Sequence, residues 1–155
     1  MVTLAFRALE EDLVVYVAGD AAPDQAEWQA YVQHAEDVAQ RWRGKSTLYK
    51  YFVFVDDGAP NATQRAAVWQ ALKGTPSRAA IVTTGLVARK IVTAFGWMGA
   101  PMRGFAPRDL EAAAKYLELS PERLPGVVAI ARTLASAVGG VRAVAALADD
   151  VASAS

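Results

Sequence analysis

The feature that most constrains the fold of this chain is an apolar run in its middle that ends in a short acidic loop. Tyr51–Val55 carry only apolar and aromatic side chains, and Asp56-Asp57-Gly58 follow directly. A run without polar alternation is typical of a strand buried on both faces, as in the centre of a parallel sheet. Asn61 with Gln64 then predicts a capped helix start. The pattern predicts an α/β protein with a loop at the end of a central strand, where such proteins often bind ligands.

The remaining elements alternate along the chain. We expect two short strands that form a hairpin, then helix, strand, helix, strand, helix, strand and helix. The expected strands are Val2–Phe6, Leu13–Ala18, Arg78–Val82 and Met102–Phe105, and the expected helices are Pro23–Trp42, about Leu86–Phe95, one that starts at Asn61 and one that Pro107 opens. In the helix after Asn61, the spacing of Ala62, Ala66, Trp69 and Leu72 predicts that these residues face the core.

Composition limits the classes of function. A chain of 155 residues with 54% hydrophobic residues is typical of a folded domain. Its formal net charge of +0 argues against a dedicated nucleic-acid binder. The absence of cysteine excludes disulfides and thiolate chemistry and is compatible with a cytoplasmic location. No signal-peptide pattern stands at the N-terminus, and we expect no transmembrane segment, since Arg132 and Arg142 interrupt the apolar C-terminal part.

The order of elements resembles that of the SpoIIAA-like (STAS-like) family over about residues 2–119. The likeness rests on the strand that ends in Asp56-Asp57-Gly58, on Arg78–Val82 followed by Thr83-Thr84, and on Arg103-Gly104-Phe105 followed by a helix with Leu110 and Tyr116-Leu117. It implies a mixed sheet of four to five strands with helices mainly on one face, and a protein that binds partners or apolar ligands without catalysis. We expect this domain in residues 1–119 and a C-terminal helical extension with a frayed end in residues 120–155.

The resemblance also implies a phosphorylated serine at the start of the helix after the central strand. Asp56 fits the family's aspartate at the strand end, but no serine stands at the helix start and Thr63 is the only hydroxyl there. A phosphate on Thr63 would be stabilised by the helix N-terminus and by Arg65. The alternative is that Asp56, Asp57 and Asn61 are loop and capping residues.

Two further segments are candidates for contact with a partner or ligand. Apolar residues at three- and four-residue steps after Pro125, among them Leu134, Val138 and Val141, predict a helix, which Gly139-Gly140 interrupts. This stripe packs either on its own domain or on a second subunit. Trp97 and Met98 lie in an expected loop, where they either fold back onto the core or contact a partner or ligand.

Other chemistry has weaker support. Asp56 and Asp57 lack the third ligand that a magnesium site needs, and the single histidine, His34, lacks a nucleophile motif and is expected on the solvated side of its helix. The segment 41–45 mixes cations with Trp42, as nucleic-acid binders do, but Trp42 is in phase with the buried helix face.

These observations predict a non-enzymatic regulatory or protein-interaction module that self-associates through the C-terminal stripe. The alternative is a binder of a small apolar or lipid-like molecule in a cavity between sheet and helices. We expect no cofactor, no metal and no nucleic-acid partner.

Overall fold

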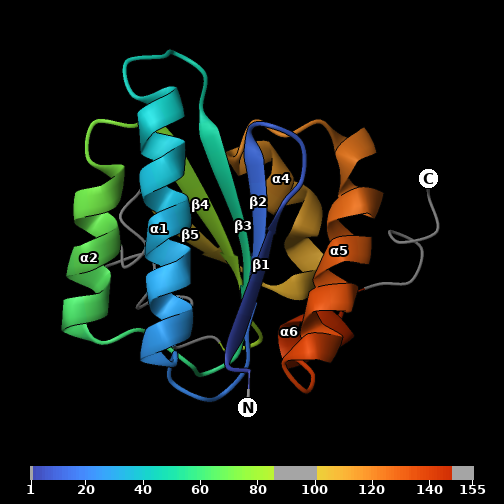
Figure 1. The fold of residues 1–155 in the computed structure, drawn as a ribbon. Helices are drawn as coiled ribbons and strands as arrows, with labels where there is room; N and C mark the ends of the chain where they lie inside the picture. Colours follow the sequence, from blue (N-terminus) through green and yellow to red (C-terminus); the bar gives the residue numbers. More distant parts are fainter. Residues whose placement is uncertain (1, 86–100, 148–155) are drawn as a thin grey trace.

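The fold is an α/β arrangement around one mixed sheet (Figure 1). The computed structural model describes residues 2–85 and 101–147. Five strands lie in the order β1-β2-β3-β4-β5; β1 is antiparallel to β2, and β2 to β5 are parallel. The strands are β1 (Leu4–Ala8), β2 (Leu13–Ala18), β3 (Tyr49–Val55), β4 (Ser77–Val82) and β5 (Met102–Phe105). The predicted hairpin, the five strands and the central position of the apolar run are confirmed.

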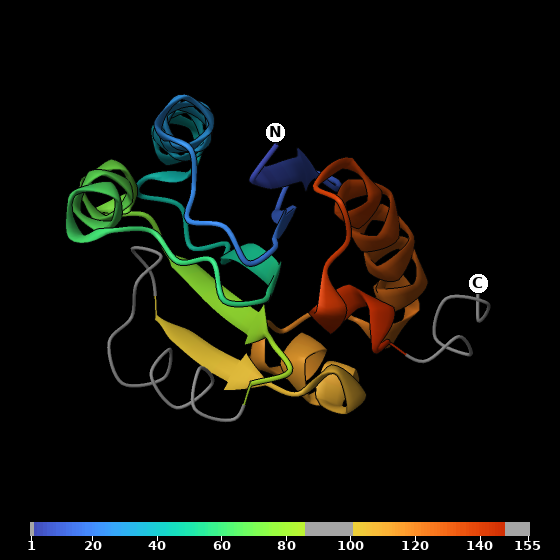
Figure 2. The same cartoon turned by 90° about the horizontal axis from the view of Figure 1, so that it is seen from below.

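Helices cover both faces of this sheet (Figure 2). Helices α1 (Gln25–Trp42) and α2 (Ala62–Leu72) pack on one face. On the other face lie α4 (Leu110–Tyr116), α5 (Leu124–Ala137) and α6 (Arg142–Ala145), with the short 3-10 helices η1 (Pro107–Asp109) and η2 (Pro121–Arg123) before α4 and α5. The expectation of helices mainly on one face is therefore wrong for the described residues. The cause is the chain after β5, which turns back and covers the second face.

The two faces of β3 explain its continuous apolarity. Phe52 and Phe54 point into the core under α4 and α5, whereas Tyr51, Val53 and Val55 point into the core under α1 and α2. All seven residues of β3 are buried. A strand with a helix layer on each side has no polar face, as the sequence predicts.

Helix α1 has the predicted apolar face and a well-defined start. Asp24 is its N-cap and accepts a hydrogen bond from the backbone N–H of Glu27 (3.2 Å). Trp28, Tyr31 and four further buried residues at helical spacing place this face on the sheet, where Tyr31 meets Tyr16 edge to face at 5.0 Å between ring centroids.

Helix α2 packs with a different face from the predicted one. Its buried residues are Gln64, Val68, Ala71 and Leu72, while Trp69 is 54% exposed. The sequence did not settle this because apolar residues stand on several sides of α2. In the structure, the indole Nε1 of Trp28 donates a hydrogen bond to the carbonyl of Gln64 (2.9 Å), so the Gln64 side of α2 lies next to α1.

The C-terminal segment forms two helices that pack on the sheet. Gly139 and Gly140 adopt positive φ values of 83° and 102°, which ends α5 before α6 begins, as the glycine pair predicts. Helix α5 lies against β2 and β1, and its buried residues share one core with β2 and β3. The boundary after Leu119 stays a prediction, but the described part of the extension supplies one wall of the domain core. The predicted helix at about Leu86–Phe95 lies outside the described residues.

Candidate interaction site at the carboxyl ends of the parallel strands

Asp56, directly after β3, holds the N-terminus of α6. Its carboxylate accepts hydrogen bonds from the backbone N–H groups of Arg142 (2.8 Å) and Ala143 (3.1 Å). The residue is only 7% exposed, so these bonds replace water that the carboxylate has lost. Asp56 is therefore a structural acceptor that ties the end of the central strand to the C-terminal segment.

Arg142 adds a second, exposed connection across the same edge. Its guanidinium makes two hydrogen bonds to the Asp20 carboxylate (2.9 and 3.2 Å) and one to Asp57 Oδ2 (3.2 Å). The negative charge of Asp20, then that of Asp56, raises the pKa of Arg142 above its ordinary value. All three paired side chains are more than half exposed, so the ion pairs are screened by water and orient the loops more than they stabilise the fold.

Gly58 lets two loops meet backbone to backbone. Its N–H donates to the carbonyl of Gly19 (2.9 Å), and a Cβ added to Gly58 would lie 2.2 Å from the carbonyl oxygen of Ala21. Any side chain at this position would collide with backbone atoms, which cannot rotate away. The glycine of the Asp-Asp-Gly sequence is thus required by a close approach of the loops after β2 and β3.

Asn61, Thr63 and Arg65 lie at the start of α2. Asn61 Oδ1 accepts from the N–H of Gln64 (2.8 Å), and Gln64 Oε1 accepts from the N–H of Asn61 (2.9 Å), so the predicted capping box is present. Thr63 is exposed in the first turn. Arg65 donates from Nη1 to the carbonyl of Pro60 (2.9 Å). Asn61 is therefore a capping residue, as one of the two alternatives predicted from the sequence states.

Gln64 fixes the position of this helix start relative to α1. Its side chain is 4% exposed and donates to the carbonyl of Pro23 (3.2 Å) and to Gln25 Oε1 (3.2 Å). The turn that carries Thr63 is therefore held from inside by a buried glutamine. Sequence reasoning recognised Gln64 only as part of the cap; its contacts with α1 depend on helices meeting in space.

The other predicted contact residues divide into two groups. Leu134 and Val141 are buried in the core under α5, and Val138 is partly buried against the same core. This stripe packs on its own domain, so the prediction that it contacts a second subunit is wrong for Leu134 and Val141. Trp97 and Met98 lie outside the described residues.

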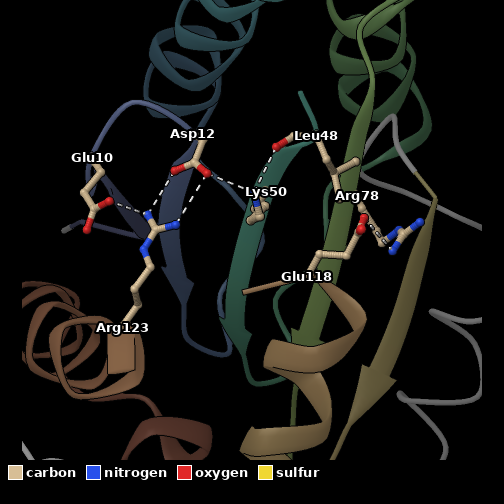
Figure 3. Close-up of polar contacts among 7 residues, drawn as sticks. All are labelled: Glu10, Asp12, Leu48, Lys50, Arg78, Glu118 and Arg123. Carbon is tan, nitrogen blue, oxygen red and sulfur yellow. Dashed lines mark hydrogen bonds and ion pairs between the residues drawn. The ribbon is translucent and has the colours of Figure 1, made fainter. Parts of the chain in front are cut away.

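A buried ion-pair network at the opposite end of the sheet was missed by the sequence reasoning (Figure 3). Lys50 is 6% exposed, and its Nζ donates to Asp12 Oδ2 (2.9 Å) and to the carbonyl of Leu48 (3.1 Å). Arg123 binds the same carboxylate through Nη2 (2.9 Å) and also Glu10 (3.0 Å). The network joins the hairpin, β3 and η2, which are far apart in the sequence.

His34 is half-buried, and the prediction of a solvated histidine is wrong. Its ring lies 5.2 Å from that of Phe6 and 6.5 Å from those of Tyr31 and Tyr49. Burial lowers the pKa of His34, and the charge of Arg41 lowers it further, against an opposing effect of Asp37. Phe6 lies in the edge strand β1, and its ring covers the side of α1 that carries His34.

One hollow among the described residues is bounded by α4 and η2. It has a volume of about 840 Å³, is open to solvent, and its lining includes Ala114, Leu119, Leu124, Glu111, Lys115 and Glu118. The alternative function, a binder of a small apolar molecule in a cavity under the helices, therefore stays a prediction.

The described residues provide no site for a metal and no membrane span. Within residues 2–85 and 101–147, no three histidine, aspartate or glutamate side chains are grouped so that they could hold an ion. No helix of that same part is both long and apolar enough to cross a bilayer. Comparison of the chain with models of known protein families, with curated proteins and with solved structures gives no match.

Proposed function

We propose that this protein is a non-enzymatic interaction module that presents the loop 57–61 and the first turn of α2 to a protein partner. The observation that carries the proposal is the contrast between the exposed and the fixed parts of this segment. Asp57 and Thr63 are exposed, whereas Asp56, Gly58 and Gln64 hold the backbone beneath them in place. A preorganised loop loses little entropy on binding, which favours recognition of a partner.

The chemistry of the same segment favours binding over catalysis. The Asp56 carboxylate is occupied by two backbone donors and is turned away from solvent. A general base must reach the proton that it removes, and Asp56 would have to release α6 to do so. Asp57 and Asp20 are paired with Arg142 at an open surface, where their charges are well solvated.

Phosphorylation of Thr63 is the regulatory form of this proposal. The hydroxyl stands in the first turn of α2, where the unpaired N–H groups and the helix dipole stabilise a phosphate. Arg65 lies two residues further on, and it would have to leave the carbonyl of Pro60 to pair with the phosphate. Self-association also belongs to the proposal, but it would use a surface other than the buried stripe of α5.

Site-specific photo-crosslinking tests the proposed contact. A photoreactive side chain in place of Thr63 should give a discrete adduct in an extract of the native host, and excess unmodified protein should suppress it. The matched control replaces Thr133, an exposed threonine on α5 whose hydroxyl donates to the carbonyl of Ala129. The proposal fails if position 63 gives no adduct, or if position 133 gives the same one.

A kinase assay in the same extract tests the regulatory form. Phosphate incorporation should disappear in Thr63→Ala and persist in Thr133→Ala. Equal incorporation into Thr63→Ala and the unmodified protein would exclude Thr63 as the modified residue.

A further inference from the structure

The zero net charge of the chain conceals a strong separation of charge along the sequence. Residues 38–108 contain eleven of the sixteen lysines and arginines but only two of the sixteen acidic residues, Asp56 and Asp57. Binding of a polyanion depends on the local field, and a neutral total does not exclude it. The argument from net charge against a polyanionic partner therefore applies to the whole chain and not to this part of it.

The structure gathers several of these cations around the C-terminal ends of α1 and α2, which lie side by side (Figures 1 and 2). Arg43, at the end of α1, reaches across to the end of α2, where its Nε lies 3.7 Å from a Cβ built on Gly74. Lys73 precedes this glycine. Lys45 lies over the ring of Trp42 with Nζ 5.1 Å from the centroid. We call Arg43, Lys45 and Lys73 at these helix ends, together with Arg65 and Trp69 along α2, the basic face.

Several cations outside the basic face are neutralised by acidic side chains of the fold. Lys50, Arg78, Arg123 and Arg142 each form an ion pair with an acidic side chain. Within the described part of the chain, the four cations of the basic face are exposed and have no such pair. Arg65 donates to the carbonyl of Pro60, but a carbonyl carries no net charge, so all four positive charges remain available to an external anion.

Trp69 gives the basic face a flat apolar component. It is 54% exposed, and among the described residues only one other large hydrophobic side chain, Val2, is comparably open. Arg65, Trp69 and Lys73 follow one another at four-residue spacing, so they form one line along α2 with about 6 Å of rise between neighbours. A solvent-exposed indole between two cations is complementary to a polymer in which planar rings alternate with negative charges.

Helix stabilisation explains only part of this arrangement. Cations near a helix C-terminus interact favourably with the dipole, which accounts for Lys73. It does not account for Lys45, which lies beyond the end of α1, or for Arg65, which lies in the first half of α2. Trp69, at 54% exposed, also leaves more than half of its surface without burial energy.

We propose that the basic face binds single-stranded nucleic acid, with bases stacked on Trp69 and phosphates neutralised by Arg43, Lys45, Arg65 and Lys73. Stacking on an aromatic ring beside cations is how sequence-tolerant single-strand binding works. An acidic protein segment could form ion pairs with the cations, but its carboxylates offer no ring to stack on the exposed indole. The proposal goes beyond the interaction function of the loop 57–61.

Fluorescence anisotropy with a labelled oligo(dT) tests the proposal. Binding should weaken with salt along a slope of about −3 in log K against log salt, since four cations release counterions from a single strand. Trp69→Ala should weaken binding about tenfold, in line with the loss of one stacked base. Lys45→Glu with Lys73→Glu should weaken it at least as much at low salt, and thermal unfolding should show that both proteins stay folded.

The control variant carries the same change of charge on the other side of the sheet. Arg108→Glu with Lys115→Glu, at exposed positions of η1 and α4, should leave most of the affinity intact. No binding of oligo(dT) at low salt, or an equal loss in the control, would overturn the proposal. Competition by poly-glutamate as effective as by unlabelled oligo(dT) would also overturn it, because the site would then recognise acidic polymers in general.

Discussion

Two groups of charged residues in this molecule differ in whether the fold uses them. Asp12, Lys50, Asp56 and Arg123 are at least partly buried and bind atoms of the same chain. The cations of the basic face are exposed and lack an acidic partner among the described residues. Charge in the first group stabilises the structure, whereas charge in the second is available for binding. Substitutions should therefore cost stability in one group and affinity in the other.

The largest effect is expected from Asp12→Asn. The substitution removes the charge that compensates Lys50, which is 6% exposed, and weakens the bond to Arg123. Breaking a buried ion pair from one side costs about 3 kcal/mol or more of unfolding free energy, measured by urea denaturation. Glu10→Gln is the control, because Glu10 is largely exposed and should change stability by less than about 0.5 kcal/mol. Similar losses in both would show that the network is a surface feature.

The same pair predicts a pH dependence. Burial raises the pKa of Asp12, but hydrogen bonds from Arg123 and Lys50 and their positive charges outweigh it and hold the pKa below its ordinary value of 3.8. The ionised pair therefore contributes its full stability above about pH 3.8, and the contribution is lost as pH falls through the lower pKa of the folded state. The difference in stability between the unmodified protein and Asp12→Asn should narrow below pH 3.8. A constant difference would contradict the pKa shift.

Asp56→Ala comes next. It leaves the N–H groups of Arg142 and Ala143 without their acceptor at a largely buried helix start, which costs about 2 kcal/mol. Asp57→Ala should cost less than about 0.5 kcal/mol, since Asp57 is exposed and only loosely paired. Urea denaturation gives the unfolding free energy of both variants, which differ only in which of two adjacent aspartates is replaced. Equal values would mean that Asp56 does not hold α6.

His34 should produce a smaller effect, visible as a pH slope. Its pKa is lowered, mainly by burial, so the folded state binds its proton less readily than the unfolded state, whose pKa is near 6.5. Stability is then full above pH 6.5 and declines as pH falls toward the folded pKa. Because the chain has a single histidine, an NMR titration assigns the pKa without ambiguity. A pKa above 6.5, or an unchanged slope in His34→Gln, would contradict the expectation.

The smallest effect on stability should come from the basic face. Lys45→Ala and Trp69→Ala remove exposed groups, so each should change the unfolding free energy by no more than about 0.5 kcal/mol. Thermal and urea unfolding measure this directly. A loss of unfolding free energy above about 1 kcal/mol in Trp69→Ala would mean that its ring supports the packing of α2. The basic face would then contribute to stability as the first group does.

The resemblance to the SpoIIAA-like family stays a prediction, because a mixed five-stranded sheet is common to many α/β proteins and does not identify one family. The structure shows one antiparallel edge strand and four consecutive parallel strands. The helices after β5 do not follow the expected one-sided arrangement.

Local sequence patterns specify most of the helices and strands and several of their ends. The unbroken apolarity of Tyr51–Val55 required two covered faces, Asn61 and Gln64 specified a capped helix start, and Gly139-Gly140 divided the C-terminal helices. These are local effects, because each depends on side chains and backbone within a few residues. The Asp-Asp-Gly loop was likewise visible, although the reason for its glycine was not.

The partners of the buried polar residues, in contrast, depend on how distant segments pack together. Gln64 and Trp28, Asp56 and α6, and Lys50 and Asp12 are pairs separated by tens of residues, and no short-range pattern specifies them. For the same reason the exposed face of α2 and the gathering of cations beside it could not be predicted. Helical spacing says which residues share a side, but packing against the sheet determines which side turns inward and which is left to bind.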